Sequence, residues 1–190
     1  MRQDMVMAWN PWYSAESDTF ERFMEQYDAK LAVEYREPGG TTALHGALMN
    51  SGMVDRVRIA NRLLDDGADA SAVIRSDNVN ALHVLFAGRK KHDFVLEAPL
   101  LKRLLDGGAD INLRSARSGV PLQALEDISA DDEELAPFYD VVFERPDIDF
   151  DVIVNRYYNR TLRDFLFNLP WGRADLLRRA QEYDAAHPRD

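Results

Sequence analysis

Cysteine is absent from this chain of 190 residues, which excludes disulfide bonds, thiolate catalysis and the commonest ligand of structural zinc. Long apolar runs are absent too. Residues 1–9 hold no stretch long enough for a signal peptide, and no later run has the length that crossing a bilayer requires. We therefore expect a cytoplasmic protein that does not bind membranes.

Patterns typical of catalysis or cofactor binding are also missing. No Ser-His-Asp set, paired-carboxylate motif or nucleophile elbow is recognisable, and the glycine pairs do not precede a helix as a phosphate-binding loop would. The histidines show no metal-ligand spacing. We predict a protein that is not an enzyme and needs no cofactor or metal. The alternative is a small hydrolase in the C-terminal part, which would need a deep cleft near Arg156, Arg163 and Trp171.

Basic residues are almost absent from residues 121–151, which contain eleven acids and one base, Arg145. This segment alone carries the formal net charge of −10 of the whole chain, because the remaining residues sum to zero. Such a surface repels phosphate backbones, so we expect no nucleic-acid partner. A basic protein is the complementary partner. The alternative is a solvated acidic segment that only aids solubility.

The densest acidic run is Asp131-Asp132-Glu133-Glu134. It resembles a calcium loop only in charge, since it lacks the alternating spacing and the central glycine. Acidic residues are favoured at the positive end of the helix macrodipole, so the run predicts the start of a helix. If the segment is an interface, these four side chains are its candidate contacts with a basic partner.

Against these absences, the chain repeats one pattern of two helices. A first unit spans residues 42–79, a second 80–119, and an eroded third 120–159. In each unit a short helix precedes a longer helix with an apolar stripe. Gly67 and Gly108 follow the second helices of the first two units, where a residue able to take positive φ is expected.

Aligned leucines mark the repeat at Leu44, Leu82, Leu122 and Leu162, at intervals of 38, 40 and 40 residues. This regularity predicts a stacked helical array. Residues 160–190 are then expected to form a helical cap at the C-terminal end, and the whole chain to form a single domain.

Residues 1–41 are predicted to form an N-terminal arm and a cap helix. Pro11 argues against a helix through its surroundings, so the neighbouring aromatic residues are expected to pack as an irregular arm. A helix is predicted from Ser17, where a capping box follows. This part resembles the second half of a unit whose first half is missing.

The units resemble ankyrin repeats, whose pattern is Thr-Pro-Leu-His-x-Ala, then a second helix ending in Leu-Leu, then Gly-Ala-Asp-hydrophobic-Asn. Residues 42–47, Thr-Ala-Leu-His-Gly-Ala, match five of six positions, and residues 107–112, Gly-Gly-Ala-Asp-Ile-Asn, match the end of the pattern. The resemblance is specific over residues 42–112 and fainter beyond. The units are longer than the family period of about 33 residues, and the extra residues are expected in long loops between the paired helices.

This resemblance to small bacterial ankyrin-repeat proteins implies an all-α solenoid of helix–turn–helix units, with about three full repeats, helical caps and extended fingers between units. Members usually bind proteins through the finger tips and first helices. By the same pattern His45 and His83 hold the fingers to the helices by bonding neighbouring backbone, and Thr42 caps its helix. His92 lies in a basic loop, residues 89–93, and is expected to be solvated.

Tyrosine and arginine most often anchor protein interfaces, and the predicted fingers carry both. The candidate contact residues on the fingers are Tyr35, Arg36, Ile74, Arg75, Asp77, Arg114 and Arg117. Tyr157 and Tyr158 either extend this row or are buried against the last unit.

The predicted function is a non-enzymatic protein–protein interaction module, monomeric when free. Its small size, concentrated acidity and lack of a secretion signal favour an immunity protein that binds and neutralises a basic toxin domain. The alternative is a regulatory scaffold or adaptor that binds cellular or host proteins through its finger tips. In the first case the acidic run matters most, and in the second Tyr35, Ile74, Arg75 and Arg114 matter more.

Overall fold

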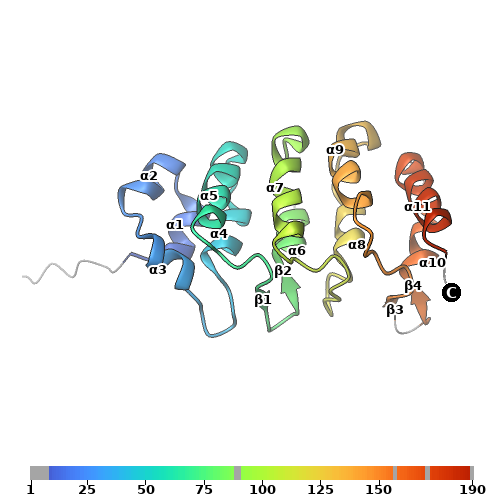
Figure 1. The fold of residues 1–190 in the computed structure, drawn as a ribbon, viewed down its shortest axis with the longest axis horizontal. Helices are drawn as coiled ribbons and strands as arrows, with labels where there is room; N and C mark the ends of the chain where they lie inside the picture. Colours follow the sequence, from blue (N-terminus) through green and yellow to red (C-terminus); the bar gives the residue numbers. More distant parts are fainter. Residues whose placement is uncertain (1–8, 88–90, 156–157, 170–171, 189–190) are drawn as a thin grey trace, which may run out of the picture.

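The computed structural model describes residues 9–87, 91–155, 158–169 and 172–188, which form eleven helices and four short strands. The prediction of a predominantly helical protein is confirmed. Figure 1 shows the helices as a row of neighbouring pairs, with the short hairpins along one edge of the row. In the described part of the chain, no helix combines the length and the apolar character that a bilayer span requires.

Each pair joins a shorter helix to a longer one that runs alongside it. The pairs are α4 (Ala43–Met49) with α5 (Met53–Asp65), α6 (Ala81–Phe86) with α7 (Phe94–Asp106), α8 (Pro121–Glu126) with α9 (Asp132–Phe143), and α10 (Leu162–Leu166) with α11 (Ala174–Ala186). The shorter helices of the first three pairs lie beside one another, and so do the longer helices of all four pairs. The aligned leucines at positions 44, 82, 122 and 162 are all buried, at 2% exposure or less.

Hairpins connect the pairs. β1 (Val73–Ile74) pairs antiparallel with β2 (Val79–Asn80), and β3 (Ile153–Asn155) pairs with β4 (Arg160–Thr161). At the two other connections the pairing shrinks to single antiparallel bridges, Arg36 with Thr42 and Ser115 with Gly119. The hairpins therefore recur between successive helix pairs along one edge.

Side-chain caps set where the short helices begin. The Thr42 hydroxyl accepts from the backbone N–H of His45 at 3.3 Å, and the side-chain Oδ1 of Asn80 accepts from the backbone N–H of His83 at 3.2 Å. A side chain that satisfies a free N–H at the first turn favours helix initiation there. Of the longer helices, α5 and α7 are followed by glycines in the left-handed region, with φ of 96° at Gly67 and 95° at Gly108.

The N-terminal part differs from its sequence-based prediction. Pro11 does not begin an irregular arm but opens α1 (Pro11–Ser17), because proline lacks an N–H that the first helical turn leaves unpaired anyway. Helix α1 lies beside α4, where a Cβ at Gly46 would come within 2.4 Å of the Trp12 carbonyl oxygen. Helices α2 (Phe20–Glu25) and α3 (Ala29–Glu34) both contact α5. Helix α1 therefore takes the place of a first helix in the N-terminal unit, and the prediction that this half is missing is wrong.

Candidate interaction surface

The hairpins are joined side by side. The Arg75 N–H donates to the Gly39 carbonyl at 2.9 Å, and the Asn78 side-chain amide donates to the Arg114 carbonyl at 2.8 Å. Gly40 has a φ of 92°, and a Cβ there would lie 2.6 Å from the Val73 carbonyl oxygen, so only glycine permits this approach. Three successive hairpin segments thus form one continuous edge.

Exposed arginines project from this edge. Arg36 donates to the Val33 and Tyr35 carbonyls, both at 3.0 Å, and its guanidinium lies 3.7 Å from Asp69. The guanidinium of Arg75 is exposed and makes no hydrogen bond or ion pair with the residues that the structure describes. A charged group with no internal partner can pair with an incoming ligand without first breaking a contact.

The other finger candidates are either paired within the protein or half-buried. Arg117 is exposed and pairs with Asp77 at 3.2 Å, whereas Arg114 is half-buried and its Nε lacks a partner. Ile74 packs against the core. Tyr35 is half-buried and donates to Glu37 at 3.1 Å. Burial raises the pKa of the Tyr35 hydroxyl, which therefore stays a neutral donor.

Two histidines brace the bases of the hairpins. The His45 Nδ1 accepts from the Thr42 N–H at 3.1 Å, and burial lowers the pKa of this imidazole to about 4. His83 repeats the arrangement with Asn80, and its Nε2 also lies 3.0 Å from the Gly119 carbonyl of the next hairpin. Burial lowers the pKa of His83 as well. Both side chains are therefore neutral at physiological pH and tie hairpin to helix.

The prediction that His92 is solvated is wrong. Its side chain is only 2% exposed, and its Nδ1 lies 2.8 Å from Glu97 Oε2. The ring also stacks on Phe94, with the ring centroids 5.3 Å apart. A ring sandwiched between an aromatic side chain and a carboxylate is part of the interior, although charged neighbours in the sequence suggested a surface loop. Residues 88–90 of that loop lie outside the described residues.

The acidic run begins a helix, as the sequence predicts. Asp131 precedes α9 and accepts from the Glu134 N–H at 2.9 Å, while Glu134 accepts from the Asp131 N–H at 3.1 Å. Glu133 is exposed and forms no hydrogen bond or ion pair with the described residues. Asp131, Glu133 and Glu134 therefore present their charge outward.

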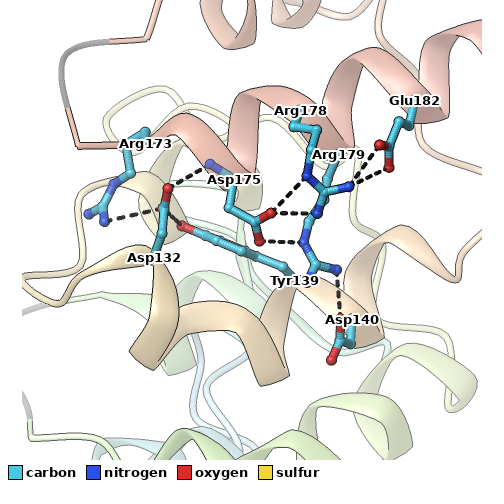
Figure 2. A network of polar contacts seen from close by, with 8 residues as sticks. All are labelled: Asp132, Tyr139, Asp140, Arg173, Asp175, Arg178, Arg179 and Glu182. Carbon is cyan, nitrogen blue, oxygen red and sulfur yellow. Dashed lines mark hydrogen bonds and ion pairs between the residues drawn. The ribbon is translucent and has the colours of Figure 1, made fainter.

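Asp132 points inward instead. Its carboxylate accepts from the Tyr139 hydroxyl at 3.0 Å and from the Asp175 N–H at 2.7 Å, as Figure 2 shows. Burial and this carboxylate raise the pKa of Tyr139 above its ordinary range. Asp132 thus holds α11 on α9 and offers little charge to a partner.

A group of arginines at the start of α11 continues this contact (Figure 2). Arg173 is largely buried and donates to the carbonyls of Glu126, Ile128 and Ala130, each at 2.7 Å. These carbonyls lie at the end of α8 and in the turn after it, where a helix leaves acceptors unpaired. Arg173 therefore caps α8 from the neighbouring pair.

Further along α11, Arg179 joins Asp175 at 2.7 Å to Asp140 of α9 at 2.6 Å. Arg178 binds Asp175 and Glu182 on its own helix. Among the described residues, ion pairs to arginine thus engage Glu126, Asp132, Asp140 and Asp147 of the acidic segment 121–151. Sequence analysis missed this partial neutralisation, although the excess of bases after residue 151 pointed toward it.

The hydrolase alternative centred on Arg156, Arg163 and Trp171. Arg156 and Trp171 lie outside the described residues, and so does the finger candidate Tyr157. Arg163 pairs with Asp184 and lies over the Phe150 ring at 5.6 Å. It borders a hollow of about 150 Å³. Tyr158 is 81% exposed on the last hairpin. Within the described ranges no three His, Asp or Glu side chains are grouped as metal ligands.

Comparison with known proteins identifies the fold but not the family. No family model matches this chain, and no curated protein matches its sequence. Among solved structures it is similar to a functionally unknown protein from Leptotrichia buccalis C-1013-b, with a TM-score of 0.71 and 20% identity. The similarity covers 95% of this chain and 96% of that one. At this identity the similarity concerns the fold alone.

Proposed function

We propose that this chain is an ankyrin-type solenoid that binds another protein, without catalysis, through its row of hairpins. The observation that carries the proposal is the continuous hairpin edge, in which hydrogen bonds of 2.9 and 2.8 Å join successive segments and arginines remain exposed. The repeat pattern of residues 42–112 and the histidine braces support the ankyrin assignment.

The hairpin edge suits binding because it is already ordered. Association costs free energy when loops and side chains must be fixed, and a surface held by backbone contacts avoids much of that cost. Arginine adds planar donors that match carboxylates and also stacks on aromatic rings. Arg75, whose guanidinium has no partner among the described residues, is the strongest single candidate for contact.

A charge reversal tests this surface. Affinity capture from extracts of the source organism is expected to recover a partner with the parent protein, and to lose it with R75E. The matched control is K102E, which reverses an exposed charge on α7, the longer helix of the second pair. Equal recovery with R75E and K102E would contradict binding through the hairpins.

The second candidate is an immunity protein that neutralises a basic toxin domain in the cytoplasm. The observation that favours it is the acidic face at the start of α9, where Asp131, Glu133 and Glu134 remain exposed while Asp132 is engaged internally. These carboxylates form no ion pair among the described residues, so they can pair with a basic domain. Their electrostatic field would also steer its approach.

This candidate makes a separate prediction. The captured partner should be basic, and its retention should fall with added salt, which screens exposed charges. E133Q should weaken the complex, whereas R75E should not. If E133Q together with E134Q leaves every captured partner in place, the acidic segment serves solubility only.

A further inference from the structure

The junction between the first two helix pairs contains two charges that are shielded from water. Arg56 and Glu97 are the fourth residues of α5 and α7, so they occupy equivalent positions in successive units. Both side chains have 0% exposure, and the Arg56 Nη1 lies 2.6 Å from Glu97 Oε1. The equivalent position in α9 is Leu135, which is buried as well.

The pair is fixed by the backbone of two turns. The Arg56 Nε donates to the Asn50 carbonyl at 2.9 Å, and its two terminal nitrogens donate to the Lys91 carbonyl at 3.2 and 3.1 Å. Glu97 Oε1 also accepts from the Asp93 N–H at 3.3 Å. One guanidinium and one carboxylate thus hold the turn before α5 and the segment that leads into α7.

His92 extends the group to the third pair. Its Nδ1 contacts Glu97, and its ring meets the edge of Phe138 in α9 at a centroid distance of 6.1 Å. Phe94 contacts the same Phe138 ring at 5.1 Å. Side chains from three successive pairs therefore meet around residues 91–97.

The buried pair favours one position of α7 relative to α5 and adds little to the stability of the fold. A buried ion pair adds little stability over an apolar pair of similar volume, because both charges lose their hydration. It does, however, penalise any displacement of α7 along α5, since a shift would leave a charge buried without its partner. The leucine-rich face of α7 alone tolerates several packings, as apolar surfaces do.

We infer that Arg56, Glu97 and His92 form a conformational lock that sets the second helix pair on the first and fastens residues 91–93 against α5. The lock involves no partner protein, so a test of the lock does not depend on the proposed function. It selects one arrangement of the array rather than adding to its stability.

The test replaces the pair by apolar residues of similar volume. R56M/E97L is expected to remain folded, with a urea midpoint close to or above that of the parent. Its amides in residues 91–98 should exchange hydrogen at least about tenfold faster, and their NMR signals should double or broaden. The control is R58M/E21L, which removes the exposed pair between Arg58, on the same helix as Arg56, and Glu21 of α2, and should leave that exchange unchanged.

Either of two results would overturn the lock. One is a folded R56M/E97L protein with a single set of signals and parental exchange in residues 91–98. If R56M/E97L does not fold, E97Q decides the matter, because it keeps the volume and removes the charge. Faster exchange at residues 91–93 in E97Q supports the lock, and unchanged exchange contradicts it.

Discussion

The first and last junctions of the array both join neighbouring helix pairs with arginine and carboxylates, but they do so in opposite environments. At the first, Arg56 and Glu97 are fully buried. At the last, Arg179 and Asp140 keep 19% and 62% of their side-chain surface exposed, in the network of Figure 2. The comparison shows that the same chemistry serves two purposes.

Water explains the difference. In the buried pair no solvent can replace a lost partner, so deleting one charge is costly while salt has little effect. In the exposed network water and ions compensate for a lost partner and screen the attraction. Arg173 lies between these cases, since it is largely buried and satisfies three carbonyls.

The largest effect is expected from E97A, which leaves Arg56 charged and buried. We expect a loss of about 3–5 kcal/mol in the free energy of unfolding, measured by urea denaturation. The control is E21A, which removes the exposed partner of Arg58 and should cost far less. Equal losses for E97A and E21A would show that burial does not distinguish the two pairs.

The next effect concerns pH in the first unit. The folded pKa of His45 is about 4, below its ordinary 6.5, so the unfolded chain binds more protons between these values. Stability is therefore full above about pH 6.5 and falls as the pH drops toward 4, by up to about 3 kcal/mol.

The third unit supplies the control for this prediction. There Gln123 replaces the histidine and accepts from the Val120 N–H at 3.2 Å, in the same capping position. H45Q should therefore keep the cap and lose most of this pH dependence, and His83 accounts for a remainder because its pKa is also lowered by burial. Unfolding curves at several pH values measure this. An H45Q protein with the full pH dependence of the parent would contradict the assignment.

A smaller loss is expected from R173A at the last junction. It removes the side-chain donor from three carbonyls at the end of α8 and in the turn after it. The Ile128 carbonyl still accepts from the Ala130 N–H at 2.9 Å, and we expect a loss of about 1–3 kcal/mol. Hydrogen exchange should rise first in α8 and the turn after it. R178A serves as the control, because among the described residues Arg178 forms ion pairs only within its own helix. Equal effects of the two variants would show that Arg173 does not cap α8.

The smallest effect is expected from D140N, which breaks the exposed contact with Arg179. A surface pair of this kind contributes about 0.2–1 kcal/mol, and screening should abolish the contribution near 1 M salt. Unfolding curves of parent and D140N should thus differ at low salt and coincide at high salt. A difference that persists at high salt would mean that the network behaves like the buried pair.

Much of the helical architecture follows from the sequence because its determinants are local or periodic. The leucines at 44, 82, 122 and 162 recur at a fixed interval and are all buried, and the acidic run does begin a helix. These features depend on helical periodicity and end effects, which a single sequence records.

Two of the failures concern side chains whose burial is not indicated by the residues next to them in the sequence. His92 follows a basic run and yet is buried by Glu97, Phe94 and Phe138. Arg56 occupies the position of Leu135, and aligning the units would have indicated that this position is internal. Pro11 was misinterpreted for a local reason, because a helix-breaking residue is also a helix-starting one.

The binding role of the hairpins remains a prediction, and site-specific photo-crosslinking tests it most directly. A photoreactive residue at Ser76 or Ala116, both exposed on the hairpins, is compared with one at Lys102 on α7 and one at Glu133 on the acidic face. If the hairpins bind the partner, we expect one shared adduct from Ser76 and Ala116, stronger than any from Lys102. Adducts that form from Lys102 or Glu133 and not from the hairpins would contradict it.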